Sequence, residues 1–488
     1  MIHFYTRIFN GRLVARLLGF MLLTMAVFML IPIGVSLYYG DGALKGFLVS
    51  VAVLVVMGVF FRSIVGRSAS YEFHEKESFW ITGVIWIVVP LVCALPYWLI
   101  GALPNYIDAV FESFSGFTST GSTVVQEFDS VPKSVLVWRS LTQWIGGMGF
   151  ILLVIAFFKK LKAGTSHLYS AEFSGTVQNK THPRMTNTVR RMWLVYLVFT
   201  ILMFLVLLFV GNDFVESLCL SFSTISTGGF SPRAGSITSF EWSTQLVVTV
   251  FMFLSGINMS LLYYLLRRKP KMLWRSEEFR FYLLVIAVAV LLLTIMLITN
   301  GVAEWQSLQY SVFQVVSTIS TGGYYIAMPG GWMKVIPLFL FVLMFFGACS
   351  GSTGGGIKMV RLMILFKYVR NQFLTMMHPR AVVPVKIDGN VIQLSYINKI
   401  FAFIFMYFVF MVAGAFVLMC CGLNLSDSMG VITANIANIG PVIDTLGATW
   451  SYADLPVVAK IVIIVEMLIG RLEIFAIIAI FSPSYWRR

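Results

Sequence analysis

Charged residues are scarce in this chain of 488 residues, and long hydrophobic runs take their place. Asp, Glu, Lys and Arg together make up 11% of the residues, whereas hydrophobic residues make up 58%. Stretches such as 19–39, 79–100 and 400–421 approach the roughly 20 apolar residues that a spanning helix needs. A soluble protein has no way to bury so many of them. The composition therefore predicts an all-α integral membrane protein.

Cysteine and histidine are also rare, with five of each. The cysteines lie in or beside apolar segments and show neither metal-ligand spacing nor a disulfide pattern. The histidines fall in predicted loops or in the N-terminal tail, and no nucleophile motif or buried carboxylate dyad accompanies them. We therefore expect no enzyme activity and no covalently bound cofactor. A membrane-embedded enzyme with unusual polar loops remains a weak alternative.

The basic residues give a net charge of +14, and they gather in alternate loops. This asymmetry follows the positive-inside rule, so both termini are expected in the cytoplasm. The basic N-terminal stretch leads into a full-length span, which argues against a cleaved signal peptide. Basic residues at helix ends anchor a membrane protein at the lipid surface, and nucleic acid is not an expected partner.

One pattern recurs four times along the chain. A long apolar span is followed by a half-span, a polar glycine-bearing turn and a second long span. The half-spans are too short to cross a bilayer, so they are predicted to be re-entrant pore helices; they are residues 107–117, 214–222, 308–316 and 426–433. The predicted organisation is two N-terminal helices followed by four pseudo-symmetric helix–pore-loop–helix repeats around a central pore, with boundaries at 1–78, 79–191, 192–280, 281–399 and 400–488.

The four polar turns, here called loops 1 to 4, are the candidate ion-binding filter. Unpaired backbone at membrane depth is tolerated only where protein or a water-filled cavity satisfies it, and rings of backbone carbonyls can replace the hydration shell of an ion. The glycines Gly121, Gly228, Gly322 and Gly440 are taken as equivalent points. The candidates are Thr118, Ser119, Thr120 and Gly121 in loop 1; Thr224, Ile225, Ser226, Thr227 and Gly228 in loop 2; Thr318, Ile319, Ser320, Thr321 and Gly322 in loop 3; and Asn435, Ala437, Asn438, Ile439 and Gly440 in loop 4.

Acidic residues are missing from all four loops, which favours a monovalent over a divalent cation. Acids do flank them, and Asp108, Glu216 and Asp427 near the starts of the pore helices are expected to act in helix capping. A cation-concentrating outer mouth is the alternative. Each return span carries a further glycine that leaves room for a cavity or for close helix packing; these are Gly146, Gly256, Gly347 and Gly470.

Two features are candidate gates. Arg471 is interpreted as the only basic residue deep inside a long span, where a charge is costly and indicates function; a salt bridge to Glu466 or Glu473 is the alternative. The second is the glycine-rich loop, residues 348–356, which is expected to break the third return span. Its ending, Gly-Ile-Lys-Met, lacks the Gly-Lys-Ser/Thr of a phosphate-binding loop. The gate candidates in it are Ser350, Gly351, Gly354, Gly355 and Gly356.

Together these motifs resemble TrkH-type subunits of the Trk/Ktr/HKT superfamily of potassium uptake proteins. The resemblance rests on the four degenerate loops and on three further stretches, Trp144-Ile-Gly-Gly-Met-Gly149, Gly351-Ser-Thr-Gly-Gly-Gly356 and Gly470-Arg471. It covers nearly the whole chain. Glycine at the first filter position, here Gly121, implies that K⁺ is the transported ion.

The resemblance also implies partners and a gating mode. It implies a location in a bacterial cytoplasmic (inner) membrane and a homodimer on a cytosolic, TrkA-like ring of nucleotide-binding regulatory subunits. It also implies a glycine-rich loop that obstructs the pore until activation. Passive gated conduction is favoured because no span carries an obvious proton relay. A sodium-preferring transporter or a cation-coupled symporter of the same fold remains open.

Overall fold

The computed structural model describes residues 11–64, 75–149, 182–326, 335–381, 383–441 and 452–472. Helices dominate these residues, as the composition predicts. The described strands are a two-stranded antiparallel hairpin of β1 (Lys386–Ile387) and β2 (Asn390–Val391), which lies beside the middle of a projecting helix. The predicted repeat boundaries remain predictions, and the four internal ones lie within the described residues.

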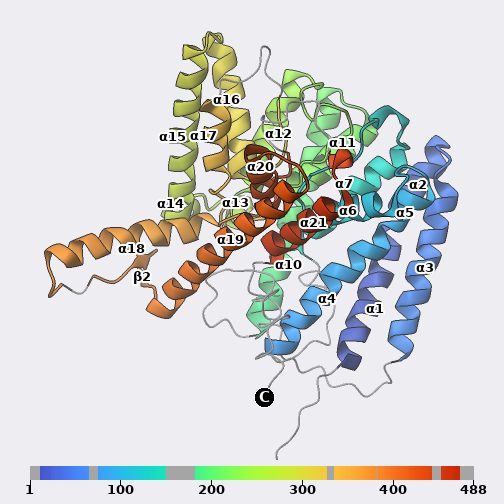
Figure 1. The fold of residues 1–488 in the computed structure, drawn as a ribbon, viewed down its shortest axis with the longest axis horizontal. Helices are drawn as coiled ribbons and strands as arrows, with labels where there is room; N and C mark the ends of the chain where they lie inside the picture. Colours follow the sequence, from blue (N-terminus) through green and yellow to red (C-terminus); the bar gives the residue numbers. More distant parts are fainter. Residues whose placement is uncertain are drawn as a thin grey trace, which may run out of the picture.

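The first predicted span consists of two helices in line, α1 (Gly11–Phe28) and α2 (Leu30–Tyr39). The second is α3 (Leu44–Ser63), and α1 packs along its length. Figure 1 shows these helices at one edge of the molecule, where they pack against α4, α5 and α7. They therefore form a flank to the central helices that carry loops 1 and 4.

The remaining helices fall into four successive groups. Each group contains a short helix that leads directly into one of the four loops; these are α6, α11, α16 and α20. The bounds are α4 (Glu75–Cys93), α5 (Leu95–Leu99), α6 (Tyr106–Phe117) and α7 (Lys133–Met148); α10 (His182–Val210), α11 (Phe214–Ile225), α12 (Trp242–Ser255), α13 (Met259–Leu266) and α14 (Lys271–Arg275); α15 (Glu277–Thr299), α16 (Glu304–Ile319), α17 (Val335–Leu343) and α18 (Met359–Met377); and α19 (Leu394–Cys420), α20 (Leu425–Ile436) and α21 (Val457–Leu472).

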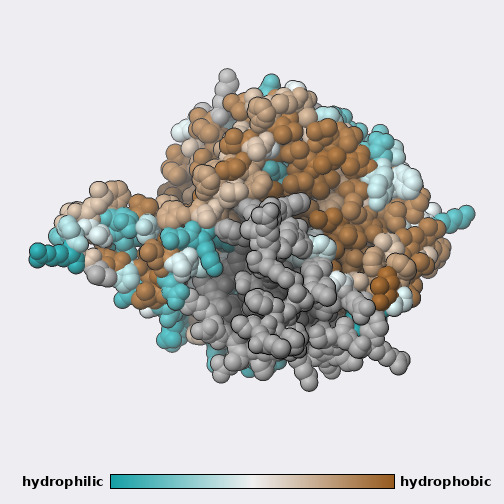
Figure 2. Space-filling view, turned by 60° about the horizontal axis from the view of Figure 1, so that its bottom comes forward, coloured by the Kyte–Doolittle hydropathy of each residue, from teal (hydrophilic) through white to brown (hydrophobic). Residues whose placement is uncertain are grey.

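Six described helical segments are long and apolar enough to cross a membrane. They are Val14–Tyr39, Leu44–Ser63, Phe79–Leu99, Asn187–Val210, Glu277–Thr299 and Leu394–Cys420. Figure 2 shows broad hydrophobic areas over the helical body and hydrophilic residues at the projecting end, where α18 leaves the bundle in Figure 1. The chain is thus a multi-pass membrane protein.

Two return spans are broken rather than straight. The second bends by 110° between α12 and α13, which the sequence analysis did not predict. The third is interrupted between α17 and α18, where the glycine-rich loop was predicted to stop the helix. Both breaks lie against each other, because the Met259 N–H donates to the Gly351 carbonyl (3.0 Å) and the Cys349 N–H donates to the Gly256 carbonyl (3.0 Å).

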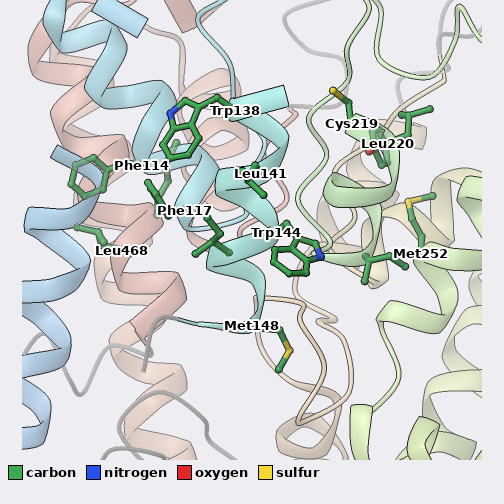
Figure 3. Close-up of a cluster of buried hydrophobic side chains, with 14 of the residues drawn as sticks. Phe114, Phe117, Trp138, Leu141, Trp144, Met148, Cys219, Leu220, Met252 and Leu468 are labelled. Carbon is green, nitrogen blue, oxygen red and sulfur yellow. The ribbon is translucent and has the colours of Figure 1, made fainter. Parts of the chain in front are cut away.

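The hydrophobic core is built around α7. Its residues Trp138, Leu141 and Trp144 lie between the side chains of α6 and α21 on one side and those of α11 and α12 on the other (Figure 3). Trp144 stacks on Tyr196 with a centroid distance of 5.3 Å, and its indole N–H donates to Thr200 Oγ1 at 3.0 Å. A helix this enclosed gives loops 1 and 2 a rigid support.

Candidate functional site

The four loops share one backbone conformation. Two residues beyond the end of each short helix comes a residue with left-handed φ, namely Ser119 (54°), Thr227 (54°), Thr321 (56°) and Asn438 (54°). The N–H of the next residue then donates to the carbonyl five positions earlier, at 2.9, 2.7, 2.8 and 2.8 Å in loops 1 to 4. Two residues after each left-handed residue comes a glycine with positive φ, in the order Gly121 (89°), Gly229 (81°), Gly323 (71°) and Gly440 (87°).

These four glycines meet around one axis. A Cβ atom on Gly121 would lie 2.3 Å from the Gly228 carbonyl oxygen, and one on Gly229 would lie 2.8 Å from the Gly323 Cα. A Cβ on Gly323 would lie 2.5 Å from the Ile439 oxygen, and one on Gly440 would lie 2.2 Å from the Thr120 oxygen. Loop 1 thus adjoins loop 2, loop 2 adjoins loop 3, loop 3 adjoins loop 4, and loop 4 returns to loop 1.

The shared geometry corrects the equivalence expected from the sequence. Gly228 and Gly322 precede the positive-φ glycines of loops 2 and 3, so they match Thr120 and Ile439 rather than Gly121 and Gly440. The equivalent residues are Gly229 and Gly323. Loops 2 and 3 each contain two consecutive glycines, and sequence alone offered no reason to prefer the second; backbone dihedrals decide the register.

Five of the candidate residues lie in the last turns of the short helices. These are Thr224, Ile225, Thr318, Ile319 and Asn435. Their side chains are buried, and the polar ones bond to protein. Thr318 Oγ1 donates to the Gln314 carbonyl at 2.8 Å, and Asn435 Oδ1 accepts from Ser122 Oγ at 2.7 Å. These residues support the loops from behind, while the remaining candidates form the loops.

Loop 4, whose sequence differs from the others, is tied to loop 1 by side chains. Asn438 Nδ2 donates to Thr120 Oγ1 (2.9 Å) and to the Met467 carbonyl (3.1 Å). The Gly440 carbonyl accepts from Ser122 Oγ (3.2 Å) and from Tyr452 Oη (2.7 Å). The amide of Asn438 thus holds the left-handed turn of loop 4 in the same place that hydroxyl residues occupy elsewhere.

Gln143 is a supporting residue that sequence reasoning missed. Its Nε2 donates to the Gly228 carbonyl (2.6 Å), and its Oε1 accepts from the Phe230 N–H (3.2 Å). One buried side chain therefore clamps both sides of Gly229. Its position near the middle of the first return span was the available signal, because a polar residue at membrane depth needs a specific partner.

Arg139 contradicts the expectation that Arg471 is the only deeply buried basic residue. Arg139 lies in α7, is 1% exposed and pairs with Glu112 at 2.6 Å. Its guanidinium also donates to Thr123 Oγ1 (3.1 Å) and to the Ser231 carbonyl (3.3 Å). The buried pair therefore joins the segments that follow loops 1 and 2.

Two of the three acids near the starts of the short helices, Asp108 and Glu216, form ion pairs. Asp108 pairs with Lys460 at 2.5 Å, and Glu216 pairs with Arg233 at 2.6 Å. The side chain that caps α11 is Asp213, whose Oδ2 accepts from the Val215 N–H at 3.2 Å. Asp108 and Glu216 therefore form ion pairs, yet both, like Asp427, lie in the first turns of their helices, where the helix dipole favours a negative charge. The basic partners of Asp108 and Glu216 offset the charge that an outer mouth would need.

The second glycines serve close packing. A Cβ on Gly146 would lie 1.8 Å from the Phe117 carbonyl oxygen, and one on Gly470 would lie 2.1 Å from the Ile436 oxygen. Phe117 and Ile436 end α6 and α20, so the return helices press directly against the ends of the short helices. Of the two readings left open by the sequence, close approach is the one that fits Gly146 and Gly470.

The glycine-rich loop lies against loops 3 and 4. The Gly355 N–H donates to Thr321 Oγ1 at 2.8 Å. A Cβ on Gly354 would lie 2.9 Å from the Ser320 oxygen, and one on Gly355 would lie 2.7 Å from the Ala437 oxygen. Ser320 and Ala437 hold equivalent positions in their loops, so the glycine-rich loop faces the same layer of carbonyls from two sides.

Arg471 joins the glycine-rich loop to α7. Its Nη1 donates to the Thr353 carbonyl (2.8 Å), and its Nη2 donates to the carbonyls of Gly146 and Gly147 (2.6 Å each). Glu466 lies on the same helix, but its Oε2 has no hydrogen-bond partner among the described residues, and Glu473 lies outside them. The guanidinium thus spans the gap between two return segments at the level of the glycine-rich loop.

Comparison with known proteins identifies the family. The family model of TrkH, described as a cation transport protein, matches residues 52–488. The Trk system potassium uptake protein TrkH of Halomonas elongata is 34% identical over 98% of this chain and 99% of its own length. The chain belongs to the TrkH family. It is accordingly a cation transport protein and not an enzyme.

Other TrkH relatives agree with this assignment. The Trk system potassium uptake protein TrkH of Escherichia coli K12 is 32% identical over 98% of the chain and 99% of its own length. The crystal structure of the potassium transporter TrkH from Vibrio parahaemolyticus superposes with a TM-score of 0.89 at 29% identity, covering 98% of this chain and all of that one. The all-α membrane fold of this TrkH family member is therefore shared along its full length.

Proposed function

We propose that this TrkH family member carries K⁺ across the bacterial cytoplasmic membrane through a filter of backbone carbonyls contributed by loops 1 to 4. One observation supports this above the others: four loops of different sequence share one backbone conformation and close on one axis. Carbonyl oxygens arranged around an axis replace the hydration shell of an alkali cation. Relatives from three organisms are named as potassium uptake proteins or as a potassium transporter, which points to the same ion.

The proposed filter omits the five candidates that lie in the short helices and adds Gly229 and Gly323. It consists of Thr118 to Gly121 in loop 1, Ser226 to Gly229 in loop 2, Ser320 to Gly323 in loop 3 and Ala437 to Gly440 in loop 4. Carboxylates are absent from these residues, which suits a monovalent ion. Glycine at each of the four positive-φ positions supports K⁺ as the preferred ion, with Na⁺ as the competing possibility.

The proposed gate is the glycine-rich loop together with Arg471. The loop borders the innermost carbonyl layer of loops 3 and 4, and Arg471 holds it to α7. A positive charge directly below the filter opposes the entry of cations. Opening would require the Arg471 hydrogen bonds to break, which makes the closed state the one that these contacts stabilise.

The partners and the topology remain proposals as well. A homodimer, a cytosolic nucleotide-binding ring and cytoplasmic termini follow from the family resemblance and from the bias of basic residues. The projecting helix α18 supports a docking role, since it extends well beyond the helical body (Figure 1). Coupling to protons or sodium remains the alternative to passive gated conduction.

Ion-competition flux in purified proteoliposomes tests the proposal. Uptake of radioactive rubidium is measured with a membrane potential imposed, in the presence of excess K⁺ or excess Na⁺. We expect K⁺ to compete strongly and Na⁺ weakly. Equal competition would contradict potassium selectivity, and uptake that persists without a potential but follows a proton gradient would favour a symporter.

A further inference from the structure

A buried carboxylate outside the proposed filter holds the glycine-rich loop in place. Glu278 lies in the first turn of α15 and is 8% exposed. Its Oε1 accepts from the Ser350 N–H at 2.5 Å, and its Oε2 accepts from Ser350 Oγ at 2.9 Å. Ser350 of the glycine-rich loop thus bonds both carboxylate oxygens of Glu278. Burying the charge of this carboxylate would be costly without such partners.

Basic and acidic side chains bond to different groups of the glycine-rich loop. Arg471 and Lys358 donate to its carbonyls at Thr353 and Gly354. Glu278 instead accepts from its amide and hydroxyl at Ser350, from the opposite end. Arg471 is attached to α21 and Glu278 to α15, so the loop is held between elements from two different repeats. A loop held this way has one well-defined position, which an isolated glycine-rich segment would lack.

Helix-dipole stabilisation does not account for Glu278. An acid in the first turn of a helix is favourable, but the neighbouring Glu277 already supplies one. Glu277 points elsewhere: its carboxylate pairs with Lys367 of α18, and its N–H donates to Asp388 Oδ1 in the turn of the hairpin at 2.8 Å. The two adjacent acids therefore bind different partners. Among the contacts described, only Glu278 reaches the glycine-rich loop.

We propose that Glu278 is a positioning residue that latches the glycine-rich loop through Ser350 and so keeps the pathway closed. This rests on the proposed function, in which that loop is the gate. The latch lies next to the residues that bind α18 and the hairpin.

The native Cys349 makes the position of the loop measurable apart from ion flux. It precedes Ser350 and is 1% exposed, so it is protected from thiol reagents while the loop is latched. The rate of its modification by a charged methanethiosulfonate reagent is measured by peptide mass spectrometry on the full-length protein in proteoliposomes. Cys93 and Cys219, which are both buried in the helical core, serve as internal references. Rubidium leak is measured on the same samples.

Glu278→Gln is the principal variant, and Glu277→Gln is its control with the same change of charge one residue away. Because a hydrogen bond to a charged group shifts a two-state equilibrium by about tenfold or more, we expect Glu278→Gln to raise both Cys349 labelling and rubidium leak about tenfold. Glu277→Gln should leave Cys349 labelling close to the parent rate. Unchanged labelling in Glu278→Gln, or an equal rise in both variants, would overturn the latch.

Two further outcomes separate the latch from the proposed function. Faster Cys349 labelling without any rubidium flux in any variant supports the latch and overturns the gating role of the loop. If Glu278→Gln does not fold, Ser350→Ala removes one of the two hydrogen bonds and leaves the carboxylate in place. Faster labelling in Ser350→Ala then supports the latch, and parent-like labelling overturns it.

Discussion

At the scale of single residues, the partners of the Arg471 guanidinium explain why a full charge is tolerated beneath the loops. Three backbone carbonyls accept from its guanidinium, and the ring of Trp86 lies 5.9 Å from its central carbon. The planar fork of an arginine presents five N–H donors from separate nitrogens, so it reaches acceptors on two different segments, whereas the three donors of an ammonium diverge from a single nitrogen. Arg471 therefore combines a repulsive charge with a mechanical tie between the glycine-rich loop and α7.

Replacing Arg471 tests both contributions. Arg471→Ala removes the charge and all three hydrogen bonds, so rubidium flux in proteoliposomes should rise about tenfold or more, given the strength of hydrogen bonds to charged groups. Arg471→Lys keeps the charge but bonds fewer carbonyls, so an intermediate flux is expected. Unchanged flux in well-folded Arg471→Ala would remove this residue from the gate.

A pair of adjacent glycines tests the corrected register of loop 3. Gly323 has a φ of 71°, and a Cβ there would meet the backbone oxygen of Ile439 at 2.5 Å. At Gly322 the nearest atom would be the flexible Met252 thioether, at 2.6 Å. Gly323→Ala should therefore reduce rubidium uptake at least about tenfold, because a left-handed alanine costs roughly 1–2 kcal/mol before any clash.

The matched control is Gly322→Ala, which should keep most of the uptake because a methionine side chain can move aside. Both proteins are compared at equal amounts in the membrane. The reverse order of damage would return the equivalence to Gly322 and contradict the register assigned from the backbone.

At the scale of elements, local sequence was sufficient for the short helices and for the break at the glycine-rich loop, but not for the bend between α12 and α13. The predicted half-span 107–117 lies within α6, and 426–433 lies within α20, because each is bounded by polar and glycine residues. The predicted half-span 308–316 is too short, since α16 extends from Glu304 to Ile319. The bend between α12 and α13 escaped notice because Asn258, whose side chain accepts from the Ser260 N–H, caps a new helix inside an apolar run.

The connection between α2 and α3 gives a prediction about pH. Asp41 accepts from Ser36 Oγ (2.5 Å), from the Ser134 N–H (3.0 Å) and from the Ala43 N–H (3.2 Å), and so ties this connection to the start of α7. Burial alone raises the pKa of Asp41, but these hydrogen bonds outweigh it and hold the pKa below its ordinary value.

Because the pKa of Asp41 is lowered by folding, its ionised form stabilises the folded protein above an unfolded pKa of about 3.9. This contribution is lost as the pH falls through the lower folded pKa. Thermal unfolding in detergent should show a lower melting temperature for Asp41→Asn at pH 7 and a smaller difference from the parent near pH 3. A difference that does not shrink in acid would exclude this role for the carboxylate.

At the scale of the whole molecule, the first and last groups of helices are joined by one buried ion pair. Lys460 of α21 and Asp108 of α6 are 4% and 6% exposed, and Lys460 Nζ also donates to the Ala453 carbonyl at 2.9 Å. The two residues are 352 positions apart in the chain. The pair therefore closes the ring at the place where loop 4 returns to loop 1.

Breaking this pair from one side should be costly. Asp108→Asn leaves a buried ammonium without its counter-charge, for which about 3–5 kcal/mol of destabilisation is typical. We expect a clear fall in the melting temperature of Asp108→Asn and of Lys460→Met, and partial recovery in the double variant Asp108→Leu/Lys460→Met. A double variant no more stable than either single one would show that the pair does not act as a unit.

The sequence by itself determined the membrane environment, the helical class, the four polar interruptions and the break at the glycine-rich loop. These follow from hydropathy, segment length and glycine content, which act locally along the chain. Tertiary structure decided which glycine of each pair lies at the axis, which acids find bases and what Arg471 and Glu278 hold. Those outcomes depend on groups from different parts of the chain being packed together, where desolvation makes each polar atom require a partner that no local pattern specifies.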